Sequence, residues 1–299
     1  MLCLALSACG GSGRAGTLLQ HTFDGSHTVR SGKLSVNLIA TPSGSRLING
    51  PLALSFGGPF QSVGQGKLPR SDFKLGFSAL GQTGSLGIIS TGDHGYVTLG
   101  GVSYQLPAAT FQKLESSFSA LGSSSGGGSR SGTLAGLGID PRRWLTSPSI
   151  VGNETVGGAS TTHIRAGVNV AALLADVSTV LKKAASAGVP GAGLIPTSIS
   201  PATRARIASE VRNPTVDVWT GSHDETLRKL AINLTLPVTG RISALLGGLR
   251  SAALAMTIQY DDVGRPQTIT APTALQPFDR FSAKLRALEQ ALSGTLGGA

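Results

Sequence analysis

This chain contains very little cysteine, few charged residues and few aromatic residues. Of its 299 residues, 2 are cysteines, 13% are charged and 5% are aromatic. The cysteines, Cys3 and Cys9, both lie at the extreme N-terminus, so disulfides cannot brace the body of the chain. A chain of this length can bury a large hydrophobic core without them, whereas small secreted domains depend on disulfides.

The low charge content argues against a disordered protein, and 40% apolar residues are enough for a core. The net charge of +10 is scattered along the chain. Because no basic run alternates with aromatic residues and no known recognition motif is present, we expect no nucleic-acid partner. Attraction to anionic lipid headgroups or cell-wall polymers fits the charge better. The positive net charge is explained equally well if arginine is simply common in the proteins of this genome.

Long apolar runs are also missing. A transmembrane helix needs about 18 consecutive apolar residues, and no segment after the N-terminus comes close to that length. The N-terminus itself contains Leu6-Ser7-Ala8-Cys9-Gly10, which has the form of a bacterial lipobox. On this interpretation residues 1–8 are a lipoprotein signal peptide, Cys9 is the lipidated first residue of the mature protein, and 9–30 are a lipidated tether. Residues 1–8 contain no Lys or Arg and are short for a signal peptide, so an ordinary N-terminus is the alternative.

Strand patterns begin near residue 31. Apolar and polar residues alternate there with a period of two, which places the apolar side chains on one face of each strand. The segments with this pattern are centred on 34–38, 52–56, 73–77, 86–90, 96–99, 102–106, 160–170, 216–220, 230–238 and 254–258. Short strands separated by Gly and Pro turns favour an antiparallel sheet with one apolar and one wet face.

Helical spacing of apolar residues is found between and after these strands. It predicts helices at 108–121, 170–187, from 201 onward and at 281–292, and a short helix from Asp140-Pro141 to Trp144. Residues 122–132 are rich in Gly and Ser and predict a loop. This order of elements is typical of an α+β fold in which helices cover the apolar face of a curled sheet. Periodicity leaves open whether the layers are fully packed or enclose an apolar cavity.

Catalytic and metal-binding motifs are missing from the sequence. The histidines are too far apart for a metal spacing: His21, His27, His94, His163 and His223. Asp93-His94 and His223-Asp224 are the candidates for a Ser–His–Asp triad, but both pairs sit in turn-like segments where polar residues are expected anyway. The candidates for a catalytic carboxylate pair are Glu154, Asp176, Asp217 and Glu225. Two roles are open for Trp144 and Trp219: they are buried under the helices, or they stack on a sugar. We expect no enzyme, no metal and no cofactor.

Several of these stretches together resemble the LppX/LprG-type (LppX/LprAFG) lipoproteins of actinobacteria, relatives of carriers with a LolA-like fold. The resemblance rests on the lipobox at Cys9 and on DPRRWL (140–145), GNETVGG (152–158), TTHI (161–164), VDVW (216–219) and LRK (227–229). It covers about residues 30–290. These motifs are turns and strand edges and carry no catalytic signature.

The resemblance implies a half-barrel antiparallel sheet with helices on its concave apolar face and a cavity for acyl chains between them. The region 31–299 would be a single lipid-binding domain, expected to be a monomer. It would bind a lipid or glycolipid and carry it across the cell envelope, while the lipid anchor holds it at the extracytoplasmic face of the cell membrane. The alternatives are a structural or sensory envelope lipoprotein with a filled core and no ligand, and an enzyme acting on envelope sugars or esters.

Candidates for the lining of such a cavity follow from the strand alternation. They are Leu34, Val36, Leu38, Leu54, Phe56, Leu75, Phe77, Leu234, Leu236, Met256 and Ile258. An acyl chain in such a cavity is held by apolar area removed from water, at about 25 cal/mol per Å², without fixed charges.

Overall fold

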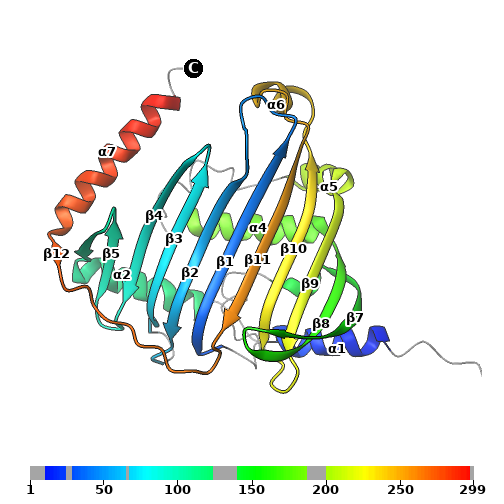
Figure 1. Cartoon of the computed structure of the whole chain (residues 1–299), viewed down its shortest axis with the longest axis horizontal. Coiled ribbons are helices and arrows are strands. Elements are labelled where there is room, and N and C mark those ends of the chain that lie inside the picture. The colour runs from blue at the N-terminus through cyan, green and yellow to red at the C-terminus, as the bar shows by residue number, and fades with distance from the viewer. Residues whose placement is uncertain (1–10, 25–28, 65–66, 124–139, 187–199, 297–299) are drawn as a thin grey trace, which may run out of the picture.

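The computed structural model shows one open 12-stranded sheet with helices on one side of it (Figure 1). The structure describes residues 11–24, 29–64, 67–123, 140–186 and 200–296. Neighbouring strands are antiparallel except at one edge, where the short β12 runs parallel to β6. The predicted α+β fold, with an antiparallel sheet curved over helices, is confirmed.

The strands are β1 (Ser31–Ser43), β2 (Leu52–Gln61), β3 (Arg70–Ala79), β4 (Gln82–Ser90), β5 (Gly95–Leu99), β6 (Val102–Gln105), β7 (Leu145–Val156), β8 (Ala159–Val168), β9 (Arg212–Gly221), β10 (Leu227–Pro237), β11 (Ser251–Asp261) and β12 (Leu275–Gln276). The helices are α1 (Gly11–Phe23), α2 (Ala108–Ser123), α4 (Val170–Ser186), α5 (Pro201–Glu210), α6 (Gly240–Leu245) and α7 (Phe278–Leu296), with a 3-10 turn, η1, at Pro141–Arg143.

Two meanders build the sheet and meet at its centre. The strand order is β12-β6-β5-β4-β3-β2-β1-β11-β10-β9-β8-β7, so β1 to β6 extend toward one edge and β11 back to β7 toward the other. The central pair β1–β11 is long and regular, running from Lys33 opposite Asp261 to Ser43 opposite Ser251. Most of the sheet is therefore joined by local hairpins, as the closely spaced strand patterns predict.

The alternation of the sequence separates the two faces of the sheet. Val36 lies opposite Ile258 on one side and opposite Phe56 on the other, so these three side chains share one face, here called the inner face. The intervening positions of β1, Lys33, Ser35 and Asn37, lie on the opposite, outer face. Figure 1 shows α1, α2 and α4 on one side of the sheet, and the packing described next identifies it as the inner side.

Two separate hydrophobic cores cover parts of the inner face, one near each edge of the sheet. The first joins α1 and α4 to β7–β10; its most buried members include Ala15, Ile164, Leu173, Val216 and Leu230. The second joins α7 to the opposite edge, where Phe281 packs on Val97, Tyr104 and Leu106. Strands β1 to β4 lie between these two cores.

The N-terminal segment differs from its predicted role as a tether. Residues 11–23 form α1, and its Ala15 and Leu19 are 0% and 3% exposed. They belong to the first core, so this segment is a packed element of the domain. Residues 1–10, and with them Cys9, lie outside the described residues, as does most of the predicted loop at 122–132, of which α2 includes 122 and 123.

Candidate functional site

All the predicted cavity-lining residues lie on the inner face. The ladder places Ile258, Val36, Phe56 and Leu75 opposite one another in consecutive strands. The neighbouring row contains Met256, Leu38, Leu54 and Phe77. Leu34 of β1 and Leu234 and Leu236 of β10 complete the set by the same alternation. The strands thus bring these residues together, and their role as the lining of a lipid cavity stays a prediction.

The centre of the inner face retains exposed apolar side chains. Leu38, Leu54, Phe77 and Ile88 are 38%, 45%, 52% and 36% exposed. On the same face, under α1 and α4, Val218 and Leu230 are each only 1% exposed. Leu38, Leu54 and Phe77 are cross-strand neighbours on β1, β2 and β3, whereas Ile88 lies further along β4, opposite Phe73. Single exposed leucines are common on proteins, but a contiguous group of large apolar side chains on adjacent strands marks a binding surface.

Aromatic rings form one end of this exposed region. The ring centroids of Phe56 and Phe73 are 4.9 Å apart, and Phe60 lies 6.2 Å from Tyr260 and 6.4 Å from Phe73. Burial among these rings raises the pKa of the Tyr260 hydroxyl above its ordinary value, because the tyrosinate anion would lose its hydration there. This end of the inner face therefore favours uncharged, apolar contacts.

The outer face carries a polar network centred on His163. The two ring nitrogens of His163 lie 2.8 Å from Glu154 Oε1 and 2.7 Å from Asp217 Oδ1. Arg165 Nε donates to the same Asp217 oxygen at 2.8 Å, and the His163 ring stacks on Trp219 with centroids 4.3 Å apart. Both nitrogens can donate to carboxylates when the ring is an imidazolium. The network therefore ties β7, β8 and β9 together.

Glu154 is held ionised by this network. Its Oε2 accepts a 2.8 Å hydrogen bond from the Trp219 indole N–H. That bond and, next, the hydrogen bond from His163 hold the pKa of the Glu154 carboxyl below its usual range. Lys229 lies over the Trp219 ring, with its Nζ 4.7 Å from the ring centroid. Glu154, His163, Trp219 and Lys229 come from four of the six motifs on which the family resemblance rests, and the fold brings these four motifs together.

The remaining candidate catalytic residues have separate partners. Asp176 accepts hydrogen bonds from the Trp144 indole N–H at 3.0 Å and from the Asp140 backbone N–H at 2.9 Å. Glu225 pairs with His21 of α1 at 2.8 Å. His94 and His223 are exposed. Since His163 directs both nitrogens at carboxylates, it offers no nitrogen to a serine, and the arrangement is not that of a Ser–His–Asp triad.

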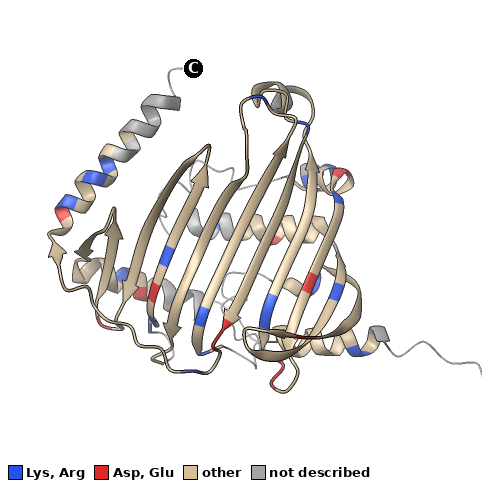
Figure 2. Cartoon of the chain, in the orientation of Figure 1, with Lys and Arg blue, Asp and Glu red and all other residues tan. Residues whose placement is uncertain are grey.

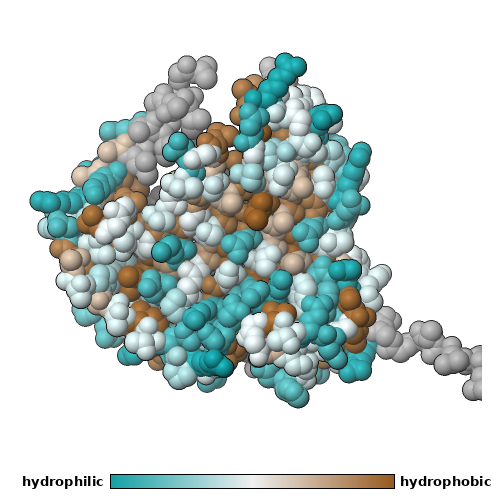
Figure 3. All heavy atoms as spheres, viewed as in Figure 1, coloured by the Kyte–Doolittle hydropathy of each residue, from teal (hydrophilic) through white to brown (hydrophobic). Residues whose placement is uncertain are grey.

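Both tryptophans are buried, as one of the two sequence interpretations requires. Trp144 is 4% exposed and belongs to the first core beneath α1 and α4. Trp219 is 8% exposed but lies on the outer face, opposite His163 in the ladder, and is not covered by the helices. Figure 3, which views the sheet from the outer side, shows polar residues along the lower part of that face and scattered apolar residues above them.

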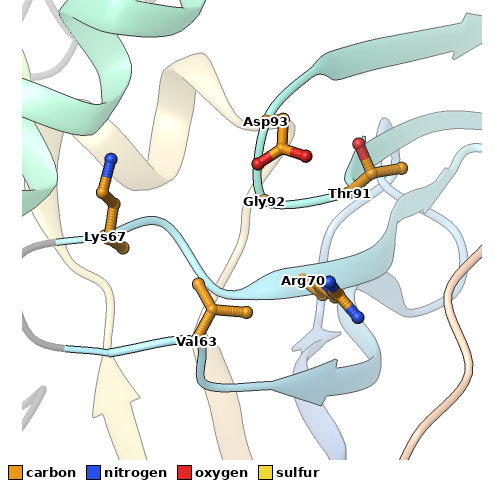
Figure 4. A pocket seen from close by; sticks show the side chains of 6 residues that line it. All are labelled: Val63, Lys67, Arg70, Thr91, Gly92 and Asp93. Atoms are coloured by element: carbon orange, nitrogen blue, oxygen red, sulfur yellow. The ribbon is translucent and has the colours of Figure 1, made fainter.

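A shallow depression of about 180 Å³ lies at the start of β3 and the turn after β4. Figure 4 shows Lys67, Arg70 and Asp93 around it, together with Val63, Thr91 and Gly92. Its mixed charged lining is unlike the hydrocarbon surface of the inner face. Within the described ranges, no helix combines the length and the apolar character needed to cross a bilayer.

The comparisons with known proteins return solved structures only; no family model and no curated protein matches the chain. LprF from Mycobacterium bovis is similar at 13% identity and a TM-score of 0.37, over 88% of this chain and 98% of that one. The Mycobacterium tuberculosis lipoprotein LppX is similar at 12% identity and a TM-score of 0.33, over 86% and 99%. A LolA-superfamily protein from Nitrosomonas europaea has 9% identity and a TM-score of 0.23, over 86% and 97%. The resemblance predicted from sequence thus reappears among the similar structures, as a distant likeness of fold.

Proposed function

We propose that this protein is an extracytoplasmic lipoprotein that binds the acyl chains of a lipid or glycolipid against the inner face of its sheet. It carries that lipid through the cell envelope while Cys9, as the lipidated residue, ties it to the extracytoplasmic side of the cell membrane. The observation that carries the proposal is the group of exposed large apolar side chains between the two cores, which consists of the row Leu38, Leu54 and Phe77 on β1 to β3 together with Ile88 on β4.

The polarity of the two faces supports this assignment. Acyl chains need apolar area and no charge partner, and the inner side of β1 offers Leu34, Val36 and Leu38 without any charged residue between them on that face. The side chains of the polar network, by contrast, lie on the outer face of β8 and β9. A ligand on the inner face is thereby separated from the ionised groups of this network.

Native mass spectrometry of the full chain, purified from its own membrane, tests the proposal directly. We expect a bound lipid that survives gentle ionisation and is lost in organic solvent. Repeated absence of lipid from such preparations would favour the alternative, an envelope lipoprotein with a filled core.

A matched pair of variants assigns the binding to the inner face. Leu38 and Leu54 are cross-strand partners on the inner face, whereas Ile39 is the next residue of β1, is 41% exposed and lies on the outer face. Leu38→Gln combined with Leu54→Gln should weaken binding of a fluorescent fatty acid by about tenfold or more, since two apolar contacts are lost. Ile39→Gln should leave it unchanged. Equal effects of both changes would contradict the proposal.

A further inference from the structure

The upper end of the sheet carries a raised tip made by two loops that are distant in sequence. One loop, 44–51, joins β1 to β2; the other, 238–250, joins β10 to β11 and contains α6. Figure 1 shows them together above the strands, at the opposite end of the sheet from α1. We call these two segments the apical tip.

Backbone hydrogen bonds join the two loops into one unit. The Arg46 N–H donates to the Gly247 carbonyl at 2.8 Å, and the Arg250 N–H donates to the Ser43 carbonyl at 2.8 Å. Ser45 Oγ donates to the Leu246 carbonyl at 2.7 Å and accepts from the Ile48 N–H at 2.9 Å. The tip is therefore a preformed element, and its exposed side chains are carried by a backbone that these hydrogen bonds hold in place.

The tip presents leucines to solvent. Leu47 is 64% exposed and Leu245 is 71% exposed, the highest values among the large apolar residues that the structure describes. Gly247 has a φ of +67°, and a Cβ there would come within 2.6 Å of Leu47 Cγ. Leu47 thus lies against a glycine at the surface and remains mostly exposed. Apolar side chains held outward in this way indicate a contact surface.

The charge of the tip has one sign. Its two segments contain Arg46, Arg241 and Arg250 and neither Asp nor Glu. Arg46 and Arg250 are exposed, and Figure 2 shows basic positions at the tip with no acidic position among them. Exposed leucines beside arginines match the boundary of an anionic bilayer, where apolar side chains enter the acyl region and guanidinium groups meet the headgroups.

We infer that the apical tip is a membrane-contact site that inserts Leu47 and Leu245 into the surface of a bilayer containing anionic lipids. It lies at the other end of the sheet from α1, so it acts independently of an N-terminal lipid anchor. The tip is also separate from the exposed apolar side chains on β1 to β4. It is therefore a second site, distinct from the surface that we propose to bind acyl chains.

Vesicle flotation of the full chain carrying Cys9→Ser, which cannot be lipidated, tests the inference. The probes are vesicles of phosphatidylcholine alone and of phosphatidylcholine with about a third phosphatidylglycerol. We expect binding to the anionic vesicles that exceeds binding to the neutral ones and weakens with added salt. Leu47→Ser with Leu245→Ser should reduce it by about tenfold or more. Arg46→Gln with Arg250→Gln should reduce it by about thirtyfold at low salt, because two basic residues near the anionic surface are lost.

The matched controls are an exposed apolar residue and an exposed arginine that lie outside the apical tip. Val151 of β7 is 51% exposed, and Arg70 is an exposed arginine at the start of β3. Val151→Ser and Arg70→Gln should retain vesicle binding. The inference is overturned if the tip variants bind as the parent does, if the controls lose binding equally, or if the parent ignores lipid charge. It is also overturned if sedimentation shows that the leucines join two copies of the chain and the variant is merely monomeric.

Discussion

His163 is a buried polar side chain on the outer face, and both of its ring nitrogens have hydrogen-bond partners. Its side chain is 5% exposed and lies between Glu154, which is 48% exposed, and Asp217, which is 10% exposed. Leaving a buried polar atom without a partner costs about 1–3 kcal/mol, so both contacts matter for the stability of this corner of the sheet. Glu154 is the more exposed of the two carboxylates, and the network lowers its pKa.

We predict that Glu154 makes stability depend on pH in the acid range. Its pKa is lowered in the folded state, first by the hydrogen bond from Trp219 and then by the one from His163. A carboxyl with a lowered pKa contributes stability that is present above its unfolded value, about 4.3, and is lost as pH falls through its lower folded value. Glu154→Gln should therefore lower the melting temperature near pH 7, by an amount that decreases toward acid pH.

Thermal melts from pH 7 to pH 2.5 measure this effect. The difference between the parent and Glu154→Gln should shrink as the carboxylate is protonated, and Glu210→Gln, an exposed glutamate on α5, serves as the control. A difference that stays constant over this range would show that the carboxylate charge is not involved.

At the scale of single elements, α1 is the element that sequence reasoning missed most clearly. It contains Gly11, Gly13 and Gly16, which disfavour a helix, and its buried apolar residues include just Ala15 and Leu19 among those that the structure describes. Its order comes from packing on β7 and β9, a tertiary contact that no local pattern reveals. β7 was missed because bulges, between Thr146 and Ser149 and between Ile150 and Gly152, break its alternation.

The inner face was predictable because the central strands keep their alternation without bulges. β1 pairs with β11 over its length in one register, so a period of two in sequence becomes one face in space. The outer network was not predictable in the same way. His163 is 54 positions from Asp217 in sequence, and the register of β8 against β9 brings them together. The paired motifs TTHI and VDVW were the available signal.

We predict that α1 is required for the stability of the domain. Leu19 is 3% exposed within the first core, and its truncation to alanine should lower the free energy of unfolding by about 2–5 kcal/mol, because a cavity remains. Gln20 is exposed on the same helix, so Gln20→Ala should have little effect. Urea unfolding followed by circular dichroism measures both. A Leu19→Ala protein as stable as the parent would restore the interpretation of this segment as a tether.

At the scale of the whole molecule, the two cores and the exposed row have different roles. The core of α1 and α4 on β7–β10 and the core of α7 on β5–β6 pack the edges of the sheet, while β1 to β4 keep exposed apolar surface on the inner side. Removing that surface from water is favourable, so a ligand that covers it binds the folded chain and not the unfolded one. Stability and occupancy are then linked.

We predict that a saturating long-chain fatty acid raises the free energy of unfolding of delipidated protein by about 2.7 kcal/mol at a free concentration of 100 times its Kd. Hydrogen exchange should locate the gain in β1 to β4, because these strands lie between the cores, with little change in η1 and the Trp144 region. Leu38→Gln with Leu54→Gln should reduce the gain to about 1.4 kcal/mol or less at the same ligand concentration, because the Kd rises about tenfold or more, whereas Ile39→Gln should retain it. A gain of equal size in both variants would place the acyl chain elsewhere than on the inner face.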